Sequence, residues 1–164
     1  MARTNLTFDP KKQRALPIWL LILAVLLIVA RIVSNRYPVK AENEADLVHW
    51  TEISQASAIA KRTHRPVFYE FSAAWCAPCR MLEHEVFMDP EFATRINARF
   101  IAVRVVDTQR EEGHNAPDVQ ALMDRYGVKV FPTIIVASPD GSVLDRVIGY
   151  PGLDKMAVLI DRTR

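Results

Sequence analysis

The chain has 164 residues, of which 50% are hydrophobic and 24% are charged, and its net charge is +2. This composition suits one globular domain plus a smaller segment and argues against extensive disorder. Residues 1–14 carry four basic side chains, whereas residues 34–164 carry sixteen basic and eighteen acidic ones. Because the larger part is slightly acidic, the sequence gives no support to nucleic-acid binding.

A run of apolar residues follows the basic N-terminus. Residues 15–30 carry no charge, and Ile32 and Val33 continue the run after Arg31. The nineteen residues 15–33 would form a helix about 28 Å long, which nearly spans a bilayer. A cleaved signal peptide and a buried core helix are the alternatives. A core helix needs a polar face, which this run lacks. Cleavage needs small residues just after the run, whereas Arg31-Ile-Val-Ser-Asn-Arg36 follows it. We therefore expect an uncleaved membrane anchor.

The basic residues around the anchor predict its orientation. Four basic side chains and the amino terminus precede the anchor, and three basic side chains, Arg31, Arg36 and Lys40, lie near its end or beyond it. The positive-inside rule then places residues 1–14 in the cytoplasm. We expect residues 34–45 to form a polar linker.

Residues 46–164 alternate between helical and strand-like patterns. The first expected elements are a short strand over 48–51, a helix from 53 that ends before Pro66, and a strand over 67–71. They are followed by a helix carrying Cys79, Leu82 and Val86, a short helix over 91–98 capped by Asp89, and a strand over 100–106. The order ends with a polar loop over 108–116, a helix from Pro117 to Gly127, two strands over 133–137 and 142–148, and a C-terminal helix. The expected fold class is α/β, with a mixed central sheet flanked by helices and one transmembrane helix before it.

The chain has two cysteines, Cys76 and Cys79, between an expected strand and an expected helix. Cys76 falls at a helix N-terminus, where free amides and the helix dipole favour a thiolate, the nucleophile of disulfide exchange. We expect Cys76 to be exposed and to attack, and Cys79 to resolve the mixed disulfide. An inert disulfide and half of a metal site are the alternatives. No histidine has a ligand spacing to the cysteines, so we expect no metal, and the exchange needs no cofactor.

Glu70 interrupts the apolar run that precedes the cysteines. Burial raises the pKa of a carboxyl group, which suits a group that accepts and donates protons near neutral pH. We therefore expect Glu70 to take up the proton of Cys79. The alternative is that Glu70 points to solvent or caps a neighbouring group.

Two stretches resemble the thioredoxin superfamily: Phe71-Ser-Ala-Ala-Trp-Cys-Ala-Pro-Cys-Arg80, and Val130-Phe-Pro-Thr133 further along. The likeness covers residues 46–164 and implies a thioredoxin-like fold. More narrowly, residues 81–90, 61–66 and Trp50 are similar to the thioredoxin-like domain that ends the membrane thiol:disulfide interchange proteins of bacterial envelopes.

The resemblance also implies a binding site for the substrate chain. Pro132 would follow a cis peptide bond and face the disulfide, and an extended substrate segment would pair with the backbone of Phe131. The residues expected to bind substrate are Trp75, Phe131, Pro132 and Thr133. A trans proline that merely begins the next strand is the alternative. Ala77-Pro78 replaces the Gly-Pro typical of cytosolic reductants, so reduction and oxidation both stay open as the direction of exchange.

We expect a membrane-tethered thiol-disulfide oxidoreductase that acts on protein substrates through Cys76 and Cys79. Its partners would be protein thiols and disulfides, the membrane, and a membrane electron-relay protein. Its place would be the bacterial inner membrane, with residues 46–164 facing the periplasm. Two alternatives stay open: a dedicated reductase of apocytochrome c thiols, and a binding or chaperone module whose disulfide is only structural.

Overall fold

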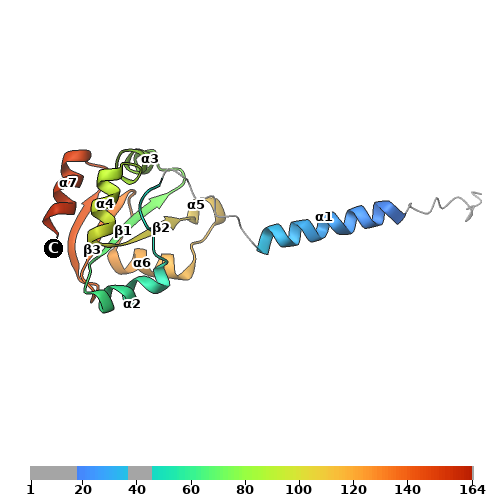
Figure 1. Ribbon diagram of the computed structural model, residues 1–164, viewed down its shortest axis with the longest axis horizontal. Helices are drawn as coiled ribbons and strands as arrows, with labels where there is room; N and C mark the ends of the chain where they lie inside the picture. The colour runs from blue at the N-terminus through green and yellow to red at the C-terminus, as the bar shows by residue number, and fades with distance from the viewer. Residues whose placement is uncertain (1–17, 37–45, 164) are drawn as a thin grey trace, which may run out of the picture. The chain divides into compact units, whose positions relative to one another are not determined.

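The computed structural model describes residues 18–36 and 46–163, which belong to two separate units of the chain (Figure 1). The first unit contains the helix α1 (Ile18–Arg36), which extends past the predicted end of the anchor into the first residues of the predicted linker. Among the described residues, no helix combines the length and the apolarity needed to cross a membrane. Residues 15–17 of the predicted anchor, the predicted cytoplasmic residues 1–14 and linker residues 37–45 lie outside the described residues.

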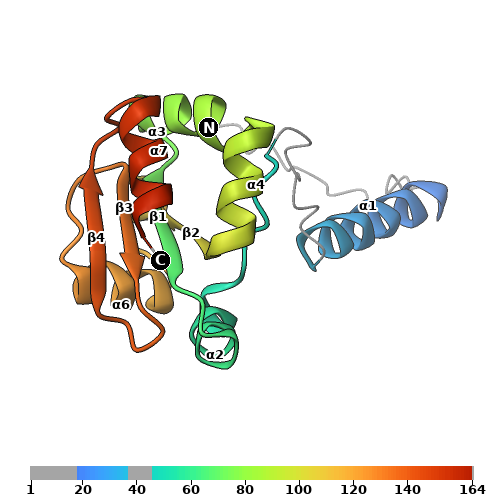
Figure 2. The same ribbon diagram turned by 60° about the vertical axis from the view of Figure 1, so that its left-hand side comes forward.

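A mixed four-stranded sheet forms the centre of the second unit, which we call the domain (Figure 2). The strands are β1 (Val67–Ala73), β2 (Ile101–Asp107), β3 (Thr133–Ala137) and β4 (Val143–Ile148), and their order across the sheet is β2-β1-β3-β4. β1 and β2 run parallel, whereas β3 is antiparallel to both β1 and β4. The α/β class and the mixed sheet expected from the sequence are confirmed.

Helices cover both faces of this sheet. They are α2 (Ile53–Thr63), α3 (Ala77–Leu82) with its continuation η2 (Glu83–Phe87), α4 (Pro90–Arg99), α5 (Gln109–Glu112), α6 (Pro117–Tyr126) and α7 (Leu153–Arg162). Figures 1 and 2 show α4 and α7 on one face and α2 and α6 on the other. β1 is consequently buried on both sides, as its continuous apolar run predicts.

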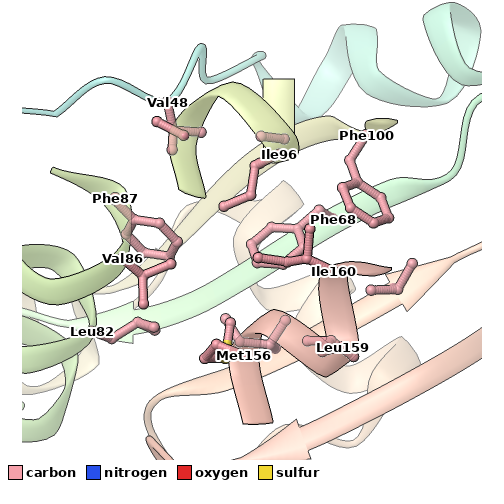
Figure 3. Close-up of a cluster of buried hydrophobic side chains, with 14 residues drawn as sticks. Val48, Phe68, Leu82, Val86, Phe87, Ile96, Phe100, Met156, Leu159 and Ile160 are labelled. Atoms are coloured by element: carbon pink, nitrogen blue, oxygen red, sulfur yellow. The ribbon is translucent and has the colours of Figure 1, made fainter. Parts of the chain in front are cut away.

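Phe68 of β1 lies at the centre of the cluster on the α4 and α7 face (Figure 3). Its ring lies 6.3 Å from that of Phe87 and 5.7 Å from that of Phe100, measured between ring centroids. Met156, Leu159 and Ile160 of α7 complete the cluster. This packing fixes β1 against the helices, and with it the position at which β1 ends and the cysteines begin.

Three elements differ from the sequence-based expectation. The expected strand over 48–51 is reduced to a single bridge, between Trp50 and Ala102 of β2. The expected loop over 108–116 contains the short helix α5. The helix after the cysteines changes at Glu83 from α to π geometry, with a hydrogen bond of 3.0 Å from the Met88 N–H to the Glu83 carbonyl. The wider turn allows two consecutive side chains, Val86 and Phe87, to be fully buried.

The two edge strands of the sheet, β2 and β4, differ in the backbone partners of their outer sides. At the β2 edge, Thr51 donates its backbone N–H to the Ala102 carbonyl at 2.7 Å, next to the Trp50 bridge. At the other edge, no described strand pairs with the outer side of β4. The middle of β4 holds two charged residues with partners inside the domain: Asp145 pairs with Arg162, and Arg146 donates to the carbonyl of Tyr126.

Candidate active site

The two cysteines form a disulfide where β1 passes into α3. Cys76 is the last residue before the helix, and its Sγ accepts a hydrogen bond of 3.2 Å from the backbone N–H of Cys79. Pro78 fits the first helical turn, where backbone amides have no partner within the helix. A free amide of the first turn thus points at the Cys76 sulfur, which is the arrangement expected for the attacking thiolate.

Both cysteines are buried in this oxidised form. Cys76 is 2% exposed and Cys79 is 7% exposed, so the expectation that Cys76 is exposed is wrong for the disulfide. The physical reason is packing: the cysteines form an apolar cluster with Ala73, and Phe131 packs against this cluster.

The residues expected to bind substrate lie near the disulfide, where Phe131 packs against the two cysteines. Trp75 is 46% exposed, and its ring meets that of Phe131 edge to face at 5.9 Å. The Phe131–Pro132 peptide bond is cis, as the resemblance implies, and Pro132 is buried. Thr133 is also buried, and its hydroxyl donates to the Val130 carbonyl at 2.7 Å. Its side chain therefore holds the turn before Pro132, while Trp75 offers the exposed apolar surface.

Glu70 is buried in the middle of β1, with 2% of its surface exposed. Burial raises the pKa of its carboxyl group from 4.5 to about 7, although the charge of Arg104 and a hydrogen bond from Ser72 act in the opposite direction. Arg104 Nε lies 3.1 Å from Glu70 Oε2, and the Ser72 hydroxyl donates to the same oxygen at 3.2 Å. The interpretation in which Glu70 points to solvent is wrong, because the fold places this side chain inside the domain.

A cavity of about 290 Å³ joins Glu70 to Cys79. Its lining consists of Glu70, Ser72, Ala73, Ala74, Cys79, Arg80, Glu83, Arg104 and Val106. A cavity of this size, with Glu70, Ser72 and Arg104 among its lining side chains, has room for water molecules that could carry a proton from Cys79 to Glu70. The structure thus brings together the two residues that the sequence interpretation linked by a proton transfer.

The sequence interpretation missed the role of Arg104. This residue stands directly opposite Glu70 in the register of β1 and β2. Its Nη1 lies 2.9 Å from Asp46 Oδ2 and 3.5 Å from Glu83 Oε1, and its guanidinium lies 4.3 Å from the Trp50 ring. The available signal was one charged residue inside each of two adjacent apolar strands, because a buried charge needs a partner.

Three further residues lie around the disulfide. His84 is exposed, and so is Arg80, which donates to the Ala74 carbonyl at 3.2 Å. Arg110 of α5 lies 5.4 Å from the Trp75 ring, a contact that the sequence did not predict. Within the described ranges, no group of three or more histidine, cysteine, aspartate or glutamate side chains is placed to hold a metal ion.

The comparisons with known proteins agree with this site. Residues 53–164 match the family model described as a thioredoxin-like domain. The thiol:disulfide interchange protein DsbD 1 of Pseudomonas aeruginosa is 31% identical over 100 residues, which cover 60% of this chain and 16% of that protein. Thioredoxin H4 of Arabidopsis thaliana is 27% identical over 104 residues, which cover 63% of this chain and 76% of that protein.

The C-terminal domain of Neisseria meningitidis DsbD in its oxidised form superposes with a TM-score of 0.52 at 26% identity, over 66% of this chain and 89% of that one. The alignments span only 18%, 16% and 17% of the length of three DsbD relatives. The family model is the match whose bounds, residues 53–164, include both cysteines of the site. The chain therefore belongs to the family of thioredoxin-like domains, and the Cys76–Cys79 disulfide lies within the matched residues.

Proposed function

We propose that this chain is a membrane-tethered oxidoreductase that exchanges disulfides with protein substrates. The observation that carries the proposal is the Cys76–Cys79 disulfide at the start of α3, with Glu70 and Cys79 lining one cavity. The DsbD relatives are named thiol:disulfide interchange proteins, which supports protein thiols as the substrate class.

The chemistry consists of two thiol exchanges. The Cys76 thiolate attacks one sulfur of the substrate disulfide, forms a mixed disulfide and releases the first substrate thiolate. Cys79 then gives its proton to Glu70 and attacks Cys76 Sγ. This step forms the Cys76–Cys79 bond and releases the second substrate thiolate, so two electrons have passed to the substrate. The same steps in reverse oxidise a substrate dithiol.

The substrate chain would bind beside Phe131. Trp75 offers exposed apolar surface against the Phe131 ring. The turn that ends in Pro132 and Thr133 brings this backbone to the disulfide cluster. Backbone pairing with an extended segment would allow many sequences to be accepted.

The tether is the second part of the proposal. Its support is the nineteen-residue apolar stretch over 15–33 and the four basic residues before it. With the amino terminus in the cytoplasm, the domain faces the periplasm of a bacterial inner membrane. Attachment would raise its effective concentration for a membrane electron-relay protein and for chains that emerge there.

The test is the reduction of insulin disulfides by dithiothreitol, with and without the full-length protein in detergent. We expect the protein to speed the reaction at least about tenfold, since its thiolate fraction exceeds that of the free reagent. Cys76→Ser should abolish the effect, because the attacking thiolate is lost. Cys79→Ser should accumulate mixed disulfides, visible on non-reducing gels, because the resolving thiol is missing.

Ala98→Ser is the control, since it introduces a serine at an exposed position of α4 without changing the Cys-x-x-Cys stretch, and it should keep the activity. A wild-type protein no faster than dithiothreitol alone would contradict the proposal. That outcome would favour a binding module with a structural disulfide.

A further inference from the structure

Three carboxylates from three separate segments of the chain meet one guanidinium beside the cavity that Cys79 lines. Arg104 of β2 pairs with Glu70 of β1 through Nε, and with Asp46 and Glu83 through Nη1. The side chains of Asp46 and Glu70 are only 8% and 2% exposed, whereas that of Arg104 is 26% exposed. Two buried carboxyl groups therefore share one guanidinium. Its distance from each of them decides how strongly its charge stabilises the ionised form of that group.

Asp46 fixes this position in two ways. Its Oδ2 lies 2.9 Å from Arg104 Nη1 and also accepts a hydrogen bond of 2.8 Å from Trp50 Nε1. The Trp50 ring in turn lies 4.3 Å from the guanidinium, at a distance typical of a cation–π contact. One carboxylate oxygen thus holds both the guanidinium and the ring on which it stacks.

In the part of the chain that the structure describes, no hydrogen bond or ion pair joins Asp46 to Glu70, whereas both pair with Arg104, so we expect Asp46 to act on Glu70 through Arg104. The charge of Arg104 lowers the pKa of Glu70 against the effect of burial. If Arg104 lost Asp46, its partly exposed guanidinium could turn toward solvent and Glu83. Glu70 would then keep its proton to a higher pH. At neutral pH a smaller fraction of the protein would have a deprotonated Glu70 that can accept the Cys79 proton.

We infer that Asp46 is a positioning residue of the redox site: it holds Arg104 against Glu70 and thereby sets the pH range in which Cys79 resolves mixed disulfides. The inference rests on the proposed function and names a control of that same site. The charged or titratable groups around Glu70 and Arg104 are Asp46 before α2, Cys79 and Arg80 of α3, and Glu83 of η2. Asp46 is therefore a part of the site that lies outside the Cys-x-x-Cys stretch and before the first helix of the domain.

The experiment is stopped-flow mixing of the reduced full-length protein, in detergent, with dithiobis(nitrobenzoate). The first release of chromophore depends on reagent concentration and reports attack by Cys76. The second release is independent of concentration and reports resolution by Cys79. Its rate is measured between about pH 5 and pH 9, which brackets a carboxyl group with a pKa near neutrality.

Asp46→Asn should move the midpoint of this pH profile upward by about one unit and slow the second phase about fivefold at pH 7, while the rate at the alkaline plateau stays the same. The first phase should be unchanged. Asp161→Asn is the matched control: it removes a carboxylate that also pairs with two arginines, Arg95 and Arg99, away from the cavity. We expect its midpoint to equal that of the wild type.

A double-mutant cycle with Arg104→Gln tests whether Asp46 acts on Glu70 through Arg104. Asp46→Asn should add no further shift once Arg104 is gone, and an additive shift would overturn the inference. A lower melting temperature with an unmoved midpoint would also overturn it, because the role would then be purely structural. Trp50→Phe, which loses the N–H but keeps a ring, should give a smaller upward shift and provides the test if Asp46→Asn does not fold. A wild-type protein without a second phase would refute the proposed function itself.

Discussion

At the scale of single residues, the pair of Glu70 and Arg104 is held in place by the register of the parallel strands. The two residues stand opposite each other in β1 and β2, so their side chains share one side of the sheet. Removing one partner of such a pair leaves the other buried and uncompensated, which costs more free energy than an exposed pair of charges ever contributes. Arg104 differs from a simple partner because Asp46 and Glu83 remain when Glu70 is neutral.

The raised pKa of Glu70 predicts a pH-dependent contribution to stability. The pKa of Glu70 in the folded state is about 7, against an ordinary value of 4.5, so at a pH between these two values folding binds a proton that the unfolded chain releases. The stability from this group is therefore complete below about pH 4.5 and is lost as the pH rises through about 7. Glu70→Gln should remove this loss. The free energy of unfolding of the variant, relative to that of the wild type, should therefore rise by roughly 3 kcal/mol from about pH 4 to about pH 8.5.

Urea unfolding of both oxidised proteins across this pH range measures the effect as a difference, so that other titrating groups cancel. Thr94→Ser, an exposed substitution that changes no charge, serves as the control and should give a difference that stays constant with pH. A Glu70→Gln difference that stays constant with pH would contradict the burial argument.

At the scale of elements, the end of α2 is held by a residue in a conformation that favours glycine. His64 follows the last turn with a φ of 55°, in the left-handed region. A side chain with a Cβ is disfavoured there, whereas glycine reaches this region without strain. His64→Gly should therefore raise the free energy of unfolding by about 0.5 kcal/mol despite the greater freedom of the unfolded chain.

The comparison is with His84→Gly in η2, where the backbone is helical. That substitution should lower the free energy of unfolding by about 1 kcal/mol, because glycine costs entropy inside a helix. Thermal unfolding of the two variants should shift in opposite directions. A loss at both positions would show that the His64 side chain stabilises the helix end by a contact of its own.

The elements with a strong apolar period were predictable, and the ones set by distant contacts were not. Proline and glycine signals marked α4 and α6 correctly, since capping chemistry is local. The π turn at η2 has no local signal, because it arises when Val86 and Phe87 both enter the core. The site follows the same division: Cys76, Cys79 and Glu70 lie within one stretch, whereas Asp46 and Arg104 meet only through the fold.

At the scale of the whole molecule, the order of helices and strands and the resemblance of two short stretches were enough for the fold family. The matched family model over residues 53–164 confirms it. Strand order is less accessible from one sequence, because the pairing of β1 with both β2 and β3 depends on contacts between distant segments. The proposed tether belongs to this scale as well, since its effect is to place the entire domain.

The tether predicts where the domain is found in a bacterial host. Alkaline phosphatase fused after Arg164 should be active, because that enzyme matures only outside the cytoplasm, and the fusion should stay with the membranes after carbonate washing. A variant lacking residues 15–33 should leave the fusion inactive in the cytoplasm. A soluble mature form beginning near Glu42 would instead establish a cleaved signal peptide.

Among the strands that the structure describes, none pairs with the outer side of β4, and this has a consequence for the domain at high concentration. An open strand is a template on which a neighbouring molecule can add its own strand, and Val143, Leu144 and Ile148 give this one exposed apolar side chains. Asp145 and Arg146 interrupt that surface, and each is tied down within its own molecule. A partner strand would have to desolvate both charges, so the same residues that brace β4 also discourage fibril-like growth from it.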